Sequence, residues 1–394
     1  MQKNTSELRI GVIGVGGRGW LAINAHNPER GLRVVAGADV NPQAFQKFSR
    51  WYGPDALVTD DDREIVARDD IGAVFVTSPD YLHEEHAVAA LEAGKAVYLE
   101  KPMAITIEGC DRILRAAAEH HAKLYVGHNM RHMAFVRKMK DLIEAGAIGE
   151  VKAGWCRHFV AYGGDAYFKD WHAERSKATS LLLQKGAHDI DVLHWLCNGY
   201  CRRVNAMGGL TLYDRIPDRH DPRERGDATF KTENWPPLAQ RGLNPVIDVE
   251  DISLMQMELD NGAFASYQQC HYTPDAWRNY TIIGTQGRVE NFGDAPGRCV
   301  VRLWNRRTDY NPYADEQHFI PAASGGHGGS DERIVAEFVR FVREGGGTTT
   351  SPVAARNSVA AGCCAAHSLR NGGIPVDVPP VEPDVLAYFA AQQA

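Results

Sequence analysis

Short apolar runs alternate with longer amphipathic stretches along the first 127 residues of the chain. The runs are continuously apolar, which is typical of strands that are buried on both faces of a sheet. Because these runs take turns with stretches of helical spacing, the pattern predicts βαβ units and a doubly wound, parallel α/β sheet. We expect strands at 8–14, 33–39, 73–77, 96–100 and 123–127, and helices at 19–27, 42–52, 83–93 and 107–120.

The pattern changes near residue 151, where apolar and polar residues begin to alternate one by one. Such alternation is typical of antiparallel strands with one exposed face, and Asp260-Asn261-Gly262 is a strong hairpin turn. The pattern therefore predicts an α+β domain with a mostly antiparallel, open sheet, and it divides the chain into domains at 1–128 and 129–394. We expect strands at 151–160, 202–210, 252–259, 263–270, 278–283 and 300–304, helices at 179–196, 331–344 and 354–369, and a long charged loop at 214–248.

The composition narrows the class of protein. A chain of 394 residues with 44% hydrophobic residues is long enough for a sizeable core in two to three domains, which excludes wholesale disorder. The formal net charge of −7 argues against nucleic-acid binding, and no apolar run approaches the roughly 18 residues of a membrane span. Eight scattered cysteines without a Cys-x-x-Cys pair are typical of reduced thiols, so we expect a cytoplasmic protein.

A glycine-rich turn, Gly14-Val15-Gly16-Gly17-Arg18-Gly19, follows the first expected strand and opens the first expected helix. In this position the spacing is the fingerprint of a dinucleotide-binding Rossmann domain, since the glycines let the backbone approach a pyrophosphate at the helix N-terminus. Asp39 ends the second strand, where a carboxylate binds the adenosine ribose and repels a 2′-phosphate. The sequence therefore favours NAD over NADP. The residues expected to bind this cofactor are Gly14, Gly16, Gly17, Arg18, Gly19 and Asp39.

Glu100-Lys101-Pro102 lies at the carboxyl end of a buried strand, the edge of an open α/β sheet at which ligands bind. Together with other motifs it resembles the glucose–fructose oxidoreductase and inositol dehydrogenase family (Gfo/Idh/MocA), over nearly the whole chain. The motifs that carry the resemblance are the glycine turn with Asp39, Thr77-Ser78-Pro79 with His83, Glu100-Lys101-Pro102, Gly127-His128-Asn129-Met130-Arg131, Gly186-Ala187-His188-Asp189-Ile190-Asp191, Val249-Glu250-Asp251 and Gly284-Thr285-Gln286-Gly287.

The resemblance implies reversible hydride transfer between nicotinamide and a secondary alcohol, commonly of a sugar or cyclitol. It also implies an N-terminal Rossmann domain and a C-terminal domain whose open sheet mediates assembly, here expected as a homodimer or homotetramer. By the same resemblance, Lys101 assists proton transfer at the reacting hydroxyl and forms a cis bond to Pro102. The residues that it implies near the nicotinamide are Thr77, Ser78, Pro79, His83, Glu100 and Asn129.

A polar stripe interrupts the apolar helix expected at 179–196. It consists of Gln184, Lys185, His188 and Asp191, which share one face because all lie within about 60° of His188 at about 100° per residue. Such a stripe must line a cavity or be paired, and a neutral imidazole suits removal of a hydroxyl proton, so His188 is a candidate base beside Lys101. Relatives similar to inositol dehydrogenase carry a carboxylate four residues before this histidine, where this chain has Gln184. The difference favours a sugar- or glycoside-oxidising branch of the family.

Other candidate substrate residues carry weaker signals. Asp189 lies about 100° from His188 on the helix and fits a structural salt bridge as well as a substrate contact. Trp171 and Arg175 precede this helix and form a pairing common in sugar sites, and His327 lies in a glycine-rich loop that could place it over a pocket. A metal site at His188, Asp191 and His194 is not favoured, because His194 lies on nearly the opposite face, so we expect no metal.

Three functions from different classes fit these residues. The leading hypothesis is an NAD-dependent dehydrogenase that oxidises a ring secondary hydroxyl of a neutral sugar, anhydrosugar or glycoside, with Lys101 and His188 handling the proton. The alternative is a glycosidase of the same fold, in which tightly bound NAD permits oxidation and elimination without net redox. The third is a non-catalytic NAD-binding protein, against which the intact Lys101 and His188 argue. In each case the partner is a small molecule and not a nucleic acid or a membrane.

Overall fold

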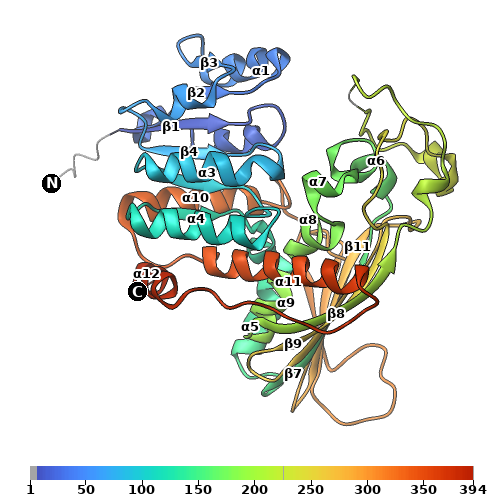
Figure 1. Ribbon diagram of the computed structural model, residues 1–394. Helices are drawn as coiled ribbons and strands as arrows, with labels where there is room; N and C mark the ends of the chain where they lie inside the picture. The colour runs from blue at the N-terminus through green and yellow to red at the C-terminus, as the bar shows by residue number, and fades with distance from the viewer. Residues whose placement is uncertain (1–6, 225, 394) are drawn as a thin grey trace. The chain divides into compact units, whose positions relative to one another are not determined.

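The computed structural model describes residues 7–224 and 226–393 of the chain (Figure 1). The chain forms two compact units, of which the first consists of Met1–His132, Gly325–Arg356 and Val381–Ala394. The second unit consists of Met133–Ser324 and Asn357–Pro380. This division differs from the expected one at 1–128 and 129–394, because two later segments return to the first unit. Among the described residues, no helix combines the length and apolar character that a membrane span requires.

The first unit contains a six-stranded sheet in the order β3-β2-β1-β4-β5-β6, and every adjacent pair is parallel. This confirms the predicted doubly wound parallel sheet, in the Rossmann strand order. The sequence pattern missed only β3, which is three residues long. The strands are β1 (Leu8–Ile13), β2 (Leu32–Ala38), β3 (Leu57–Thr59), β4 (Ala73–Val76), β5 (Ala96–Leu99) and β6 (Leu124–Val126).

Helices cover both faces of this sheet, and one of them comes from far along the chain. The stretch after the glycine turn is a 3₁₀ helix, η1 (Arg18–Ala25), and not a longer helix over 19–27. The α10 helix (Ser330–Glu344) belongs to this unit because its Phe338 packs in the same core as Phe75 and Tyr98. The other helices are α1 (Pro42–Tyr52), α2 (Asp62–Val66), α3 (His83–Glu92), α4 (Ile107–Glu119) and α12 (Pro383–Gln393), with short 3₁₀ turns η2 (Pro28–Arg30), η3 (Asp80–Leu82) and η4 (Asn129–His132).

The second unit contains a nine-stranded sheet in the order β14-β13-β12-β11-β7-β10-β9-β8-β15. Only the pair β7–β10 is parallel, which confirms the predicted, mostly antiparallel sheet. Burial alternates along β9, as one covered and one exposed face require. The strands are β7 (Val151–Phe159), β8 (Cys201–Gly209), β9 (Ile252–Leu259), β10 (Phe264–Cys270), β11 (Trp277–Gly284), β12 (Arg288–Phe292), β13 (Cys299–Trp304), β14 (Glu316–Ile320) and β15 (Val376–Asp377).

Two helices, α5 (Ala134–Glu144) and α9 (Gly186–Cys197), pack against each other and against one face of this sheet. The helix expected at 179–196 is divided at Lys185 into α8 (Leu181–Gln184) and α9. Gly186 directly follows the break, and glycine is a poor helix former. The Tyr267 ring lies 3.0 Å from the position of a Cβ at Gly186, which leaves little room for a larger residue. The remaining helices are α6 (Gly163–Tyr167), η5 (Trp171–Ala173), α7 (Arg175–Ala178) and α11 (Pro352–Arg370), which begins in the first unit and ends in the second.

The segment between β8 and β9 contains three single-turn 3₁₀ helices, η6 (Tyr213–Arg215), η7 (Thr232–Asn234) and η8 (Pro237–Ala239), within its described residues. Its apolar side chains join a small separate core with residues of α6 and α8, including Phe168, Tyr213 and Leu243. The Asp251 carboxylate accepts backbone hydrogen bonds from Thr211 and from the two residues that follow it. These bonds therefore hold the two ends of the segment to each other.

Candidate functional site

The turn after β1 requires glycine at two positions. Gly14 has a φ of +89°, and a Cβ there would lie 2.5 Å from the backbone nitrogen of Ser78. A Cβ at Gly19 would lie 2.6 Å from the carbonyl oxygen of Gly14, so a larger residue would force the turn apart. Gly17 has no atom within 4 Å of its Cβ position, which leaves the outer side of the turn open.

Asp39 directly follows β2, and its carboxylate reaches the glycine turn. Its Oδ2 accepts a hydrogen bond from Gly16 N at 2.8 Å, and its Oδ1 accepts one from Asn41 N at 2.8 Å. These bonds hold a half-buried carboxylate at the carboxyl edge of the parallel sheet, where the ribose of a dinucleotide binds in folds of this type. The turn and this carboxylate therefore fit NAD.

The loops that follow β4 and β5 are locked together by His83. Its Nδ1 lies 2.7 Å from the carbonyl oxygen of Pro102, and its Nε2 lies 2.9 Å from that of Ser78. The side chain is 1% exposed, so the role that the structure shows for His83 is to link these two loops. The peptide bond between Lys101 and Pro102 is cis, as the resemblance implied. The expected residues Thr77, Ser78 and Pro79 form the loop between β4 and η3.

Arg18 joins the glycine turn to the loop that contains Lys101. Its Nε and Nη2 donate to Glu100 Oε1 at 3.0 and 2.9 Å, and its two terminal nitrogens each donate to Asp331 at 3.1 Å. Glu100 Oε2 accepts a hydrogen bond from the backbone nitrogen of Lys101 at 3.0 Å. A change at Arg18 therefore reaches the backbone of Lys101 through a single carboxylate.

Asp331 is the centre of this network. It is fully buried at the start of α10, and besides Arg18 it accepts a hydrogen bond from Asn129 Nδ2 at 3.0 Å and lies 2.8 Å from His327 Nδ1. Burial opposes its charge, but the contacts from His327 and Arg18 outweigh burial and hold the pKa of Asp331 below its usual value. Asn129 Oδ1 is buried and has no hydrogen-bond partner among the described residues, so it can accept a hydrogen bond from a ligand at this edge.

Asp189 lies on α9 in the second unit and is an internal anchor. It is fully buried, and its carboxylate accepts hydrogen bonds from Arg278 Nε at 2.9 Å, from Tyr267 at 3.0 Å and from Tyr280. Burial would raise the pKa of Asp189, but the charge of Arg278 together with the contacts of His158 and Tyr280 outweighs burial and keeps this pKa well below its usual value. Of the two interpretations of Asp189 left open by the sequence, the structure provides the salt bridge.

The polar stripe of the second unit is buried, with exposed fractions of 4% for Gln184, 9% for Lys185, 8% for His188 and 1% for Asp191. The ammonium of Lys185 lies 5.6 Å from the ring centroid of Tyr162 and 5.5 Å from that of Tyr167. Burial, with a further contribution from the charge of Arg278, lowers the pKa of Lys185 to about 7. The stripe therefore contains an amine that can exchange a proton near neutral pH.

The weaker candidates have different surroundings. Arg175 Nη2 lies 3.3 Å from Glu250 Oε1, so its guanidinium takes part in an ion pair. Trp171 stacks on His172 with ring centroids 3.7 Å apart. His327 belongs to the first unit with the cofactor-side residues and not to the unit that contains the polar stripe. Across 7–224 and 226–393, no group of three or more His, Cys, Asp or Glu side chains is arranged to hold a metal ion.

The predicted residues thus divide between the units. The glycine turn, Asp39, Lys101, Asn129 and His327 belong to the first, whereas residues 171–191 belong to the second. Sequence reasoning missed Asp331 and Arg278 as organising residues. Asp331 is 313 residues from Arg18, and Arg278 is 89 residues from Asp189, so no local pattern could have paired them.

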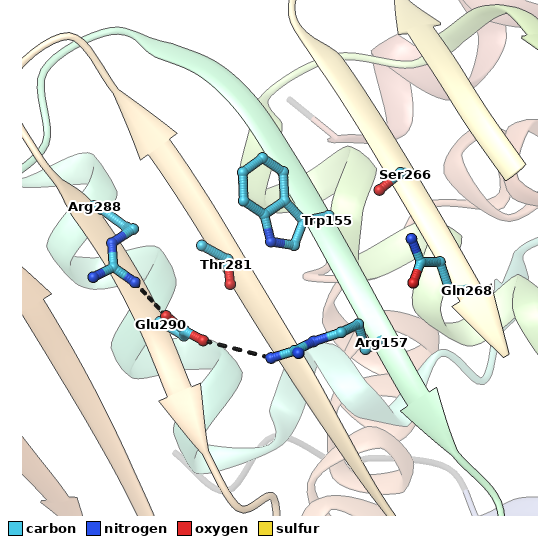
Figure 2. A pocket seen from close by; sticks show the side chains of 7 residues that line it. All are labelled: Trp155, Arg157, Ser266, Gln268, Thr281, Arg288 and Glu290. Carbon is cyan, nitrogen blue, oxygen red and sulfur yellow. Dashed lines mark hydrogen bonds and ion pairs between the residues drawn. The ribbon is translucent and has the colours of Figure 1, made fainter. Parts of the chain in front are cut away.

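A shallow cavity of about 510 Å³ lies on the exposed face of the nine-stranded sheet, away from the polar stripe (Figure 2). Glu290 is paired there with Arg288 and, at 3.9 Å, with Arg157. None of the predicted site residues lines this cavity. The lining side chains come from β7, β10, β11 and β12 and are Trp155, Arg157, Ser266, Gln268, Thr281, Arg288 and Glu290.

Two family models match the chain. Residues 8–128 match one described as "Oxidoreductase family, NAD-binding Rossmann fold", and residues 136–290 match one described as "GFO/IDH/MocA C-terminal domain". The two matches together span well over half of the chain.

Individual proteins are also similar. The protein YteT of Bacillus subtilis (strain 168), named as an oxidoreductase, is 27% identical over 312 residues, which make up 69% of this chain and 72% of YteT. An inositol 2-dehydrogenase/D-chiro-inositol 3-dehydrogenase of Shouchella clausii (strain KSM-K16) is 34% identical over 218 residues. That match covers 55% of this chain and 60% of the enzyme, less than two thirds of its length. A solved structure of levoglucosan dehydrogenase in complex with NADH and L-sorbose has a TM-score of 0.76 and 26% identity, covering 95% of this chain and 99% of that one.

Proposed function

Because the chain belongs to the Gfo/Idh/MocA family of NAD-binding oxidoreductases, we propose that it oxidises a ring secondary hydroxyl of a neutral sugar, anhydrosugar or glycoside. One observation carries the proposal. Lys101 follows β5 at the same carboxyl edge that holds the glycine turn and Asp39, so a dinucleotide-binding edge also bears an amine able to act on a hydroxyl. The names of the relatives support a polyhydroxylated ring as substrate, since they include inositol and levoglucosan dehydrogenases.

In this proposal, Lys101 and His188 handle the proton of the reacting hydroxyl, and Gln184, Lys185 and Asp191 orient neighbouring hydroxyls. Bound NAD supplies the hydride acceptor, so the chain has to bind the ring and remove one proton. Asp39 makes NAD the preferred cofactor, because its carboxylate would repel the 2′-phosphate of NADP.

A neutral substrate is supported by uncharged polar atoms in the second unit. Gln184 Oε1, Gln269 Nε2 and both ring nitrogens of His271 are buried without a hydrogen-bond partner among the described residues. Each of these side chains is at most 4% exposed. A hydroxyl group both donates and accepts hydrogen bonds, so a polyol can pair with the donors and the acceptors among these buried atoms. A phosphate can only accept hydrogen bonds, so it would leave the acceptors unpaired.

The test incubates the purified protein with NAD⁺ and a panel of sugars, anhydrosugars, cyclitols and aryl glycosides. We expect reduced-nicotinamide absorbance to rise with stoichiometric formation of a ketone, and Lys101→Met to abolish this rise while NAD binding is retained. Release of phenol from an aryl glycoside without accumulation of NADH would instead identify a glycosidase with recycled NAD. Binding of NAD without turnover of any compound would favour a non-catalytic protein and refute the proposal.

We also propose that the exposed face of the nine-stranded sheet binds a second copy of the chain, giving a homodimer or homotetramer. Its large exposed apolar side chains support this, because Met207 is 70% exposed, Phe264 62% and Leu254 44%. Sedimentation equilibrium of Phe264→Glu against the unmodified protein tests it, since a charge at this position should favour the monomer. The eight free cysteines are consistent with a cytoplasmic protein, which we propose as its location.

A further inference from the structure

Lys185 occupies an unusual position for a charged residue. It lies at the break between α8 and α9, and its side chain is nine-tenths buried. Its ammonium faces the rings of Tyr162 and Tyr167, and within residues 7–224 and 226–393 it makes no hydrogen bond or ion pair with a carboxylate. Buried ammonium groups are normally paired, so the surroundings of Lys185 suit the neutral amine.

The two carboxylates whose charge favours the ammonium of Lys185, Asp189 and Asp294, are both paired with Arg278. Asp189 is occupied by Arg278 at 2.9 Å, and Asp294 lies 3.6 Å from the same guanidinium. Lys185 is both the C-cap residue of the four-residue helix α8 and the N-cap residue of the twelve-residue helix α9, and the dipole of the longer helix disfavours a cation there. The titratable or charged groups around it are Asp189 on α9, His158 on β7, Arg278 on β11, Asp294 after β12, His271 after β10, and Tyr162 and Tyr167 at α6.

These neighbours leave Lys185 able to change its protonation. Burial and Arg278 together disfavour the ammonium more than Asp189 and Asp294 favour it, which lowers the pKa of Lys185 to about 7. Burial also lowers the pKa of His158 to about 3, so this neighbour stays neutral and adds no charge. The residue immediately before Lys185 is Gln184, whose amide can orient a hydroxyl but cannot take up its proton.

We propose that Lys185 is a third proton-exchanging residue, which contacts the sugar and takes up the proton that Lys101 and His188 withdraw from the oxidised hydroxyl. This inference rests on the proposed dehydrogenase function. In the step, bound NAD⁺ would accept the hydrogen and electron pair of the carbinol C–H bond. The O–H bond breaks, and its proton passes by way of Lys101 and His188 to form a new bond to Nζ of Lys185. The products are a ketone, NADH and the Lys185 ammonium. The amide of Gln184 then binds a hydroxyl next to the reacting one.

Two substitutions separate proton transfer from cation binding. Lys185→Arg keeps a positive charge that cannot be lost at neutral pH, and Lys185→Met keeps the length without an amine. We expect both to lower kcat/KM by about 100-fold or more, since a positioned acid–base group contributes at least this factor, with NAD binding changed less than about twofold. Lys177→Met serves as the matched control, because Lys177 pairs with Glu174 at 3.0 Å on a more exposed surface. Nearly full activity of Lys185→Arg would overturn the proposal, because a fixed cation would then suffice.

The pH profile provides a second criterion. Since the base must be neutral, kcat/KM of the unmodified enzyme should fall about tenfold per pH unit below about pH 7, where Lys185 becomes protonated. This limb should be lost in Lys185→Met, whose residual rate depends on other groups. A limb unchanged by the substitution would overturn the assignment.

A third measurement does not depend on turnover. In protein labelled with ¹³C at the ε-carbon of lysine, the signal missing from Lys185→Met identifies Lys185, and its chemical shift is followed against pH without NAD or substrate. A midpoint near pH 7 is the expected result, and one above about pH 9, close to that of a free lysine, would overturn the inference while the dehydrogenase assay stands. Absence of turnover with every compound would refute the proposed function, and this assignment with it, whatever the midpoint.

Discussion

Replacing Asp189 with asparagine tests whether this buried carboxylate stabilises the second unit or binds substrate. The substitution keeps the shape of the side chain and removes its charge, so Arg278, whose side chain is 12% exposed, loses the carboxylate 2.9 Å away. Removal of one partner of a buried ion pair costs about 3–5 kcal/mol. Arg278 retains Asp294 at 3.6 Å, which places the expected loss near about 3 kcal/mol.

This loss can be measured by thermal unfolding. For a unit of roughly 200 residues, about 3 kcal/mol corresponds to a Tm lower by about 6–12 °C. The pKa of Asp189 is lower in the folded protein than in the unfolded chain, so its ionised carboxylate stabilises the fold. This contribution is complete above the unfolded pKa of about 3.9, and it disappears as the pH falls through the pKa of Asp189 in the folded protein. The Tm of Asp189→Asn should therefore differ most from that of the unmodified protein near neutral pH.

Two further variants complete the experiment. Asp189→Asn combined with Arg278→Met should recover part of the lost stability, because it removes the uncompensated cation. Asp227→Asn is the control, since the interactions of Asp227 are exposed: an ion pair with Lys231 at 2.8 Å and a hydrogen bond from Thr229 N at 3.0 Å. Its Tm should stay within about 1 °C. If Asp189→Asn leaves the Tm unchanged but lowers kcat/KM by about 100-fold, the carboxylate acts on substrate and the structural interpretation is wrong.

The remaining predictions concern the first unit. Burial opposes the charge of Glu337, but its contact with His132 Nε2 at 3.4 Å and hydrogen bonds from Thr349 and Tyr125 lower its pKa to about 2. Glu337→Gln should therefore lose about 2–3 kcal/mol of unfolding free energy at pH 7 in urea titrations, and this deficit should vanish as the pH falls from about 4.5 to about 2. Asp39→Ala should lower kcat/KM for NAD by about 10–100-fold and raise the ratio of NADP to NAD activity, and an unchanged ratio would contradict the ribose assignment. Gly14→Ala should abolish NAD binding, measured by calorimetry, because the φ of +89° at this position disfavours any residue with a Cβ. Gly17→Ala is the control and should leave the Tm unchanged, because no atom lies within 4 Å of the Cβ position of Gly17.

Local sequence signals were sufficient for most of the fold. The apolar runs of the first 127 residues predicted five of the six parallel strands, because strands buried on both faces carry a strong and continuous signal. The three-residue β3 was missed because it is too short for a pattern. The sequence also predicted a helix at 331–344 but assigned it to the wrong unit. An amphipathic pattern shows that Phe338 faces a core, and it does not show that this core includes Phe75 and Tyr98.

The parts of the candidate site that consist of a local motif could be predicted from the sequence. The parts that depend on residues distant in the sequence could not. The glycine turn and Asp39 could be paired from sequence because strand order brings them to one edge. The break at Lys185 could not be predicted from apolar spacing, which continues through it, although Gly186 gave a weak signal. The charge balance around Lys185 depends on Arg278, which is 93 positions further along the chain. Burial and long-range charge decide which polar residue can change its protonation, and neither is written in a local pattern.

Arg18 links the glycine turn to the loop of Lys101 in the first unit. Its guanidinium is part of the glycine turn, yet its bonds go to Glu100 and Asp331 and not to that turn. Burial opposes its charge, but the two carboxylates outweigh burial and hold the pKa of Arg18 above its usual value, so it stays charged at every pH at which the protein is folded. Because Glu100 also binds the backbone nitrogen of Lys101, the glycine turn and the lysine loop share one rigid contact. A chain that kept both motifs but lost Arg18 would therefore retain the cofactor turn while its lysine loop lost a support, which makes Arg18 a positioning residue for Lys101.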